Sequence, residues 1–352
     1  MKTLNRFQLT TGAVLVTTFA ALPQIANAAD NIEFKWSGQI SRAITFADNG
    51  TDDDVLFVDN NNSGTRLRLT GEMDINPDLK AGIVWETQFQ DNDSSAQDIG
   101  DSDSSSAFKS RKRDLWFKGG WGKLSLGQGD GAANGTSEVD FSGTTIADYS
   151  GNNLDDGISF ADSVGNKIVK NGAVFDNFDG LSRNDRVRYD SPNYGPIGVA
   201  VSGGQDRSEL GLRYSQNLGG GSKVGAALGY VSNDDAGWKQ LGLSASYITA
   251  GGFNITGHYG EQDRDGAGVD PEGLYIKVGQ KIGQHSVSLG WQQVDDLAAT
   301  GDEAERINLA YVYNIKKGIE LFADYQNASL DRAGGVSLDD VNQFSIGSRI
   351  KF

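Results

Sequence analysis

Alternation of apolar and polar residues with a period of two runs through most of this 352-residue chain. Near the N-terminus, for example, Phe34 and Trp36 alternate with Lys35 and Ser37. Successive side chains of a strand point to opposite faces, so each such segment predicts a β-strand with one apolar face. Sixteen segments have this pattern: 32–46, 65–75, 79–90, 109–119, 123–129, 184–192, 196–204, 208–218, 222–232, 239–249, 253–262, 272–282, 285–295, 304–315, 319–329 and 342–352.

The connections between the predicted strands alternate in length. Every second connection is a short turn, such as 76–78 or 219–221, whereas most of the others are longer and acidic, such as 48–64 and 91–108. Outer-membrane barrels have short periplasmic turns and long outer loops. A soluble β-sandwich also alternates, but sixteen consecutive strands exceed the usual sheet, and a sandwich gives no reason for alternating loop lengths. The pattern therefore predicts an all-β fold, a transmembrane antiparallel up-and-down β-barrel of about 16 strands.

The composition agrees with a barrel. The chain has 47 glycines, 5 prolines and 33 aromatic residues (6 Trp, 11 Tyr and 16 Phe), but its mean hydropathy is only −0.42. In a barrel only every second strand residue faces lipid, which keeps the average hydropathy low. The net charge of −16 argues against a nucleic-acid partner, and the absence of cysteine excludes disulfides and thiolate metal sites.

The first 28 residues have the pattern of a cleaved signal peptide. Lys2 and Arg6 are followed by an apolar run over 12–22 and by a small-x-small motif that ends at Ala28. The alternative, a membrane anchor, needs about 20 apolar residues, and this run is shorter. We therefore expect export through the Sec pathway, cleavage after Ala28, and a single mature domain over 29–352.

Several segments resemble the Gram-negative general porin family. Segment 65–86 resembles the family's second hairpin, 117–128 resembles the hairpin that leads into its constriction loop, and 186–194 resembles the strand that leaves this loop. The C-terminal strand resembles the signal that the barrel-insertion machinery reads, which here consists of Phe344, Ile346, Ile350 and Phe352. The resemblance implies a homotrimeric outer-membrane channel, in contact with lipid and lipopolysaccharide, for passive diffusion of ions and small hydrophilic solutes. It implies no cofactor and no catalytic or metal site.

The longest connection, 130–172, is the candidate constriction loop. A sixteen-stranded barrel has a water-filled lumen, so a pore that sorts solutes needs a narrowing. The stretch 129–166 contains seven acids and no base, and the resemblance implies that it folds into the channel. Its length and its apolar residues favour this position over that of a solvent-exposed acidic loop. The acids expected at the constriction are Glu138, Asp140, Asp148, Asp155 and Asp156.

Strand parity predicts a basic wall that faces this loop. The arginines that alternation places inward are Arg66, Arg68, Arg186 and Arg188. On 109–119 the parity of Arg111 and Arg113 is ambiguous. Opposed acids and bases produce a transverse field across a narrow wet slot, and the excess of acids predicts weak cation selectivity. The alternative role for these arginines is in structural salt bridges.

Two other functions remain open at this point. A sugar-specific porin needs an inward aromatic track on which ligands can stack, but Trp116, Tyr275 and Phe322 are scattered over the inward face. A barrel enzyme needs a nucleophile within reach of a base. Of the two histidines, His258 is predicted to face inward beside Asn254, which suits a wall residue better than a base.

Overall fold

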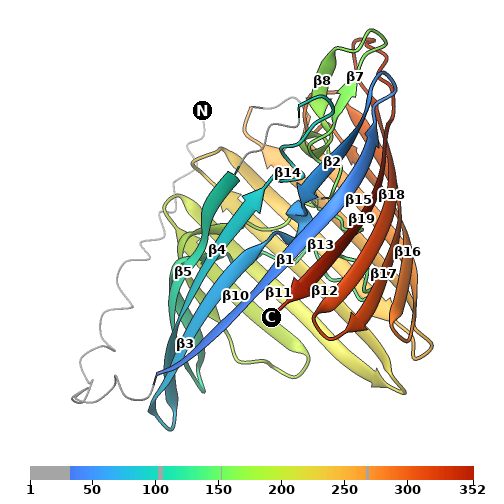
Figure 1. Ribbon diagram of the computed structural model, residues 1–352. Coiled ribbons are helices and arrows are strands. Elements are labelled where there is room, and N and C mark those ends of the chain that lie inside the picture. The colour runs from blue at the N-terminus through green and yellow to red at the C-terminus, as the bar shows by residue number, and fades with distance from the viewer. Residues whose placement is uncertain (1–31, 102–105, 152, 267–268) are drawn as a thin grey trace, which may run out of the picture.

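Strands from both ends of the chain meet in one closed antiparallel sheet in the computed structural model (Figure 1). The structure describes residues 32–101, 106–151, 153–266 and 269–352, so the predicted signal peptide lies outside the described residues. Seventeen strands of the described residues belong to this sheet. They are β1 (Glu33–Asp48), β2 (Asp53–Asp59), β3 (Arg66–Asn76), β4 (Leu79–Asp91), β5 (Ser106–Gly119), β6 (Gly122–Asp130), β9 (Arg183–Asp190), β10 (Ile197–Gly204), β11 (Arg207–Gly219), β12 (Ser222–Asn233), β13 (Trp238–Ile248), β14 (Phe253–Arg264), β15 (Glu272–Ile282), β16 (His285–Asp295), β17 (Glu303–Lys316), β18 (Ile319–Asp331) and β19 (Val341–Lys351).

The first strand closes the barrel. One edge of β1 pairs with β19, from Gln39 opposite Lys351 to Asp48 opposite Asn342. Its other edge pairs with β3 over its first half and with β2 over its second half. Because β2 and β3 share one place beside β1, the ring has sixteen positions, and the predicted barrel is confirmed. Closure leaves no open sheet edge in the lipid, where an unpaired backbone group would be costly.

The outer face of the barrel is apolar. On β17, Ile307, Leu309 and Tyr311 point outward and are about half exposed, whereas Asn308 and Ala310 between them are buried on the inside. The exposed apolar side chains are those that lipid covers in the membrane. None of the helices in the described part of the chain is long and apolar enough to cross a membrane.

The predicted acidic connection 48–64 contains an additional strand. After a tight turn at Gly50, which has a φ of +85°, β2 folds back along β1 and ends at the short 3-10 helix η2 (Asn61–Ser63). Val55 and Phe57 of β2 face outward, and Leu56 and Val58 are buried. The sequence pattern does not reveal this strand, because seven residues, three of them acidic, carry only two alternations.

Residues 131–182, which we call the inner loop, connect β6 to β9 and pack against one side of the lumen. Within the loop, β7 (Ser159–Ala161) and β8 (Lys167–Lys170) form a hairpin at the same end of the barrel as the tip of β1 and β2 (Figure 1). Side chains of the loop and of the wall share one buried apolar cluster. The cluster includes Ile146, Leu154, Phe160, Val174 and Phe175 of the loop and Val294, Val312, Phe322 and Leu330 of the wall.

The two sides of the lumen therefore differ. Along β13 to β18, inward side chains are buried beneath the inner loop. On β3 the inward Arg66, Arg68 and Thr70 remain half-exposed. The water-accessible space of the barrel consequently lies against the wall that begins at β3.

Substitution by arginine distinguishes the two faces of the wall. Leu309→Arg, at the outward midpoint of β17, should destabilise the folded barrel by about 2–4 kcal/mol, because lipid solvates the charge poorly. Thr70→Arg should cost far less, because Thr70 lines a polar cavity. Urea unfolding in lipid vesicles measures both values. Equal losses at the two sites would contradict the assigned strand parity.

Candidate functional site

A polar cavity of about 650 Å³ separates the half-exposed wall from the inner loop. Its lining contains six basic and five acidic side chains, so its charges are nearly balanced. The basic residues are Arg66, Arg68, Lys109, Arg111, Lys112 and Arg183, and the acidic residues are Glu86, Asp130, Glu138, Asp176 and Asp179.

Glu86 organises the basic side of the cavity. This carboxylate is buried, and its two oxygens accept hydrogen bonds of 2.6 Å from the Nε atoms of Arg68 and Arg111. Arg111 also donates to Gln88. One acid thus fixes two guanidinium groups and neutralises only one of them. The wall remains net positive where it faces the cavity.

A β-bulge turns Arg111 inward. Glu86 pairs with Lys112 and Thr87 pairs with Ser110, so Arg111 is the unpaired extra residue on β5. A bulge of this kind reverses the alternation on one side of it. The structure resolves the ambiguous parity of this segment: Arg111 and Lys112 both line the cavity, whereas Arg113 is exposed. Alternation alone could not reveal the extra residue.

The predicted wall residues Arg186 and Arg188 lie beneath the start of the inner loop. Arg186 donates from Nε to the carbonyl of Asp130 over 3.0 Å, and Arg188 donates from Nη1 to that of Gly131 over 2.6 Å. Arg213 of β11 continues the series, with Nη2 at 2.7 Å from the Asn134 carbonyl. These three guanidinium groups hold the first turn of the loop on the wall.

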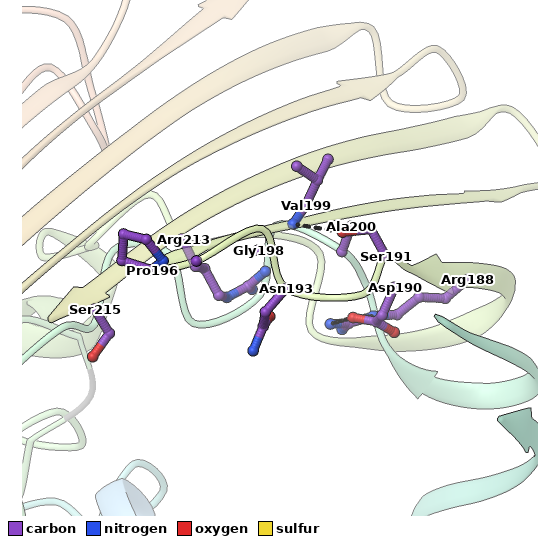
Figure 2. A pocket seen from close by; sticks show the side chains of 11 residues that line it. Arg188, Asp190, Ser191, Asn193, Pro196, Gly198, Val199, Ala200, Arg213 and Ser215 are labelled. Atoms are coloured by element: carbon purple, nitrogen blue, oxygen red, sulfur yellow. Dashed lines mark hydrogen bonds and ion pairs between the residues drawn. The ribbon is translucent and has the colours of Figure 1, made fainter. Parts of the chain in front are cut away.

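Both predicted arginines also have carboxylate partners. Arg186 binds Asp114 through two hydrogen bonds of 2.9 Å, and Arg188 donates to Asp190 over 2.7 Å. Figure 2 shows Arg188, Asp190 and Arg213 around a second cavity, of about 270 Å³, beside the β9–β10 turn. A third cavity, of about 340 Å³, shares Arg68 with the first and Arg188 with the second. The three cavities follow one wall from the inner loop to a short-turn end of the barrel.

Lys277 of β15 binds the inner loop on the opposite side. Its Nζ is fully buried and lies 2.7 Å from Asp140 Oδ2 and 3.5 Å from Asp148 Oδ2. The hydroxyl of Tyr275, also on β15, donates to Asp148 over 2.8 Å. Asp140 and Asp148 therefore belong to a buried ion-pair cluster and do not line the first cavity.

Arg306 of β17 makes a second buried cluster. Its Nη1 lies 3.2 Å from Asp155 Oδ1 and 3.7 Å from Asp156 Oδ1, and its Nη2 donates to Gln292 over 2.7 Å. Of the five acids expected at the constriction, the structure thus places Glu138 alone on the first cavity. The other four acids are paired with Lys277 and Arg306. Period-two alternation places both of these cations on the inward face, and this was the signal in the sequence that could have identified them as partners.

Glu138 and Asp179 form the acidic side of the cavity. Asp179 accepts hydrogen bonds from the backbone of Gly135, over 2.6 Å, and of Ser137, over 3.0 Å. Removal from water raises the pKa of Glu138. Removal from water and the adjacent Glu138 carboxylate raise the pKa of Asp179 well above its usual value. The pair therefore becomes neutral at a higher pH than ordinary carboxyl groups do.

The C-terminal residues complete the ring on its outer face. Phe352 exchanges backbone hydrogen bonds of 2.9 and 3.0 Å with Gly38, and its ring is exposed. Phe344 stacks on Phe46 of β1 with their ring centroids 6.2 Å apart. Ile346 and Ile350 are also exposed on this face. These four side chains lie along the seam at which β19 joins β1.

A closed barrel with an apolar exterior and a charged, hydrated interior defines an outer-membrane channel. The sequence of residues 12–333 matches the Gram-negative porin family model. The chain belongs to this family, whose members are channels of the Gram-negative outer membrane and not enzymes.

Individual relatives are more distant. The chain is 26% identical to outer membrane protein U of Vibrio parahaemolyticus over 278 residues, which cover 76% of each protein. Among solved structures, the anion-selective porin of Comamonas acidovorans superposes with a TM-score of 0.63 at 17% identity, covering 91% of this chain and all of that one. A loop-deletion variant of OmpT from Vibrio cholerae superposes with a TM-score of 0.62 at 14% identity, covering 92% of this chain and 100% of that one. At such identities the structures establish the shared fold.

The raised pKa values of Glu138 and Asp179 predict a pH-dependent pore charge. As the pH falls, protonation should remove negative charge from the loop side of the cavity. This should occur at pH values above the usual carboxyl pKa range of about 3.9–4.3. The permeability to cations relative to anions, measured as the reversal potential at a series of pH values, should therefore fall as the solution becomes acidic. In the double variant Glu138→Gln, Asp179→Asn this fall should be smaller, and Asp176, which also lines the cavity and whose pKa is raised by burial, should account for the remainder. A fall as large as in the wild type would assign the titration to other groups.

Proposed function

We propose that this porin is a general diffusion pore, in which ions and small hydrophilic solutes pass between the basic wall and the inner loop. The observation that carries the proposal is the 650 Å³ polar cavity, with Arg66, Arg68 and Arg111 on one side and Glu138 and Asp179 on the other. In this proposal the inner loop is the constriction, and passage needs no conformational change.

The opposed charges would sort solutes by polarity. A transverse field orders water in the slot, and a polar solute replaces that water with its own interactions with the two walls. An apolar molecule disrupts the ordered water and gains nothing in return. Size selection follows from the distance between the inner loop and the basic wall.

Weak cation selectivity is part of the proposal. The cavity lining is nearly balanced, so the excess negative charge of the chain, −16 in all, lies mostly elsewhere. The outer connections supply much of it, for example Asp52, Asp53 and Asp54 at the tip of β1 and β2. These charges concentrate cations at the mouth, but salt screens them over about 8–10 Å at physiological ionic strength. The preference should therefore weaken as salt rises.

The buried position of the inward aromatic side chains supports a general pore over a sugar-specific one. Trp116, Tyr275 and Phe322 are each no more than 9% exposed. They pack against the wall or the inner loop, where a sugar ring cannot stack on them. A sugar-specific pore remains the alternative, and oligosaccharide that blocked single-channel current at low concentration would favour it.

We also propose the cellular route and assembly of the protein. Residues 1–28 would direct export through the Sec pathway, and Phe344, Ile346, Ile350 and Phe352 would be read by the barrel-insertion machinery. The mature protein would form a homotrimer in contact with lipopolysaccharide. One similar solved structure, OmpT of Vibrio cholerae with a TM-score of 0.59, is described as a trimer form.

Reversal potentials across a KCl gradient test the selectivity. The wild type should prefer cations weakly, and more strongly at low salt. Glu138→Gln should lower this preference and Arg66→Gln should raise it, because both residues line the cavity.

Asp265→Asn is the matched control, since it removes one charge from an exposed outer turn. Its effect should be smaller than that of Glu138→Gln. An anion-selective wild type would contradict the proposed selectivity and would mean that the basic wall dominates the field.

A further inference from the structure

Five glycines lie side by side across five neighbouring strands. Each is the direct pairing partner of the next, and all five are buried on the inward face. This glycine row consists of Gly211 of β11, Gly229 of β12, Gly242 of β13, Gly260 of β14 and Gly273 of β15.

The backbone conformation does not require glycine at these positions. None of the five has a positive φ, and the pairing runs through the row without a register shift. A glycine in a strand also marks a site at which another part of the chain approaches closely. The close neighbour of this row is the inner loop.

The start of the inner loop lies directly on the row. A Cβ atom added to Gly211 would lie 2.2 Å from the carbonyl oxygen of Ala132, and one added to Gly229 would lie 2.1 Å from Thr136 Oγ1. Both distances are far below ordinary van der Waals contact, so the loop would have to move. The missing side chain lets the loop backbone contact the strand directly at Gly211, and at Gly229 it makes room for the Thr136 side chain.

The end of the inner loop occupies the rest of the row. A Cβ on Gly242 would lie 2.2 Å from Ser137 Oγ and 2.5 Å from the carbonyl oxygen of Phe178. One on Gly260 would lie 2.5 Å from the Phe178 Cβ. The Phe178 ring extends over Gly273, with Cε2 at 2.8 Å from the position of an added Cβ. Phe178 has a φ of +47° and is buried. The two ends of the loop thus cross one smooth strip of wall.

We propose that the glycine row sets the aperture of the pore by determining how far the inner loop stands from the basic wall. This inference rests on the proposed function, in which the loop is the constriction. The loop is seated on the row from one side, and Glu138 and Asp179 face the cavity from the other side of the same segment. Any side chain added to the row would push these groups toward Arg66 and Arg111 and narrow the slot.

Single-channel conductance in planar bilayers tests the inference. Gly229→Ala and Gly242→Ala should each lower conductance by roughly 1.2- to 2-fold, and the corresponding valine variants should lower it further. Gly257→Ala is the matched control, because Gly257 lies on β14 and an added Cβ would contact only the Tyr275 carbonyl oxygen, at 3.9 Å. The control should conduct like the wild type.

A compensating substitution covers the case in which the alanine variants fold poorly. Thr136→Ala removes the atom that faces Gly229, so the double variant Gly229→Ala, Thr136→Ala should recover folded protein and most of the wild-type conductance. Row variants that conduct like the control, or that conduct more than the wild type, would overturn the inference. A wild type that conducts no ions would instead overturn the proposed function.

Discussion

Two buried cations, Lys277 and Arg306, hold the inner loop against one wall, and the rest of the pore depends on this attachment. Each is no more than 2% exposed and contacts two aspartates of the loop. A buried charge costs several kcal/mol unless it is paired, and removal of one partner of a buried pair typically costs about 3–5 kcal/mol. The wall and the loop therefore satisfy each other's charges only when the loop lies inside the barrel.

This attachment divides the lumen into a packed side and a wet side. Beneath the loop, the glycine row and an apolar cluster bring the loop into direct contact with the wall, whereas the opposite wall keeps Arg66, Arg68 and Arg111 on an open cavity. Arg186, Arg188 and Arg213 hold the loop at its first turn. A chain segment with this many attachments has little freedom to move, which suits a fixed opening better than a gate.

The ring of strands was predictable because its signal is local. Period-two alternation marks a strand at each of the sixteen positions, with an interruption at the bulge on β5, and in an up-and-down barrel the strands that follow each other in the chain pair with each other. The sequence pattern could not show that Arg111 is the extra residue of a bulge, because a bulge changes parity without changing composition. Nor could it separate Glu138, which faces the cavity, from Asp140 two residues later, because their difference depends on Lys277, far away in sequence.

The central claim is that the inner loop lies on the inward face of β15 to β17 while the pore is open, and a disulfide tests it most directly. Thr144 Oγ1 of the loop and Ser288 Oγ of β16 are 2.7 Å apart, and the chain has no native cysteine. In the variant Thr144→Cys, Ser288→Cys, mild oxidation should join the two residues completely, with single-channel conductance unchanged. Folded, conducting protein that forms no disulfide, or loss of current on oxidation, would contradict the account.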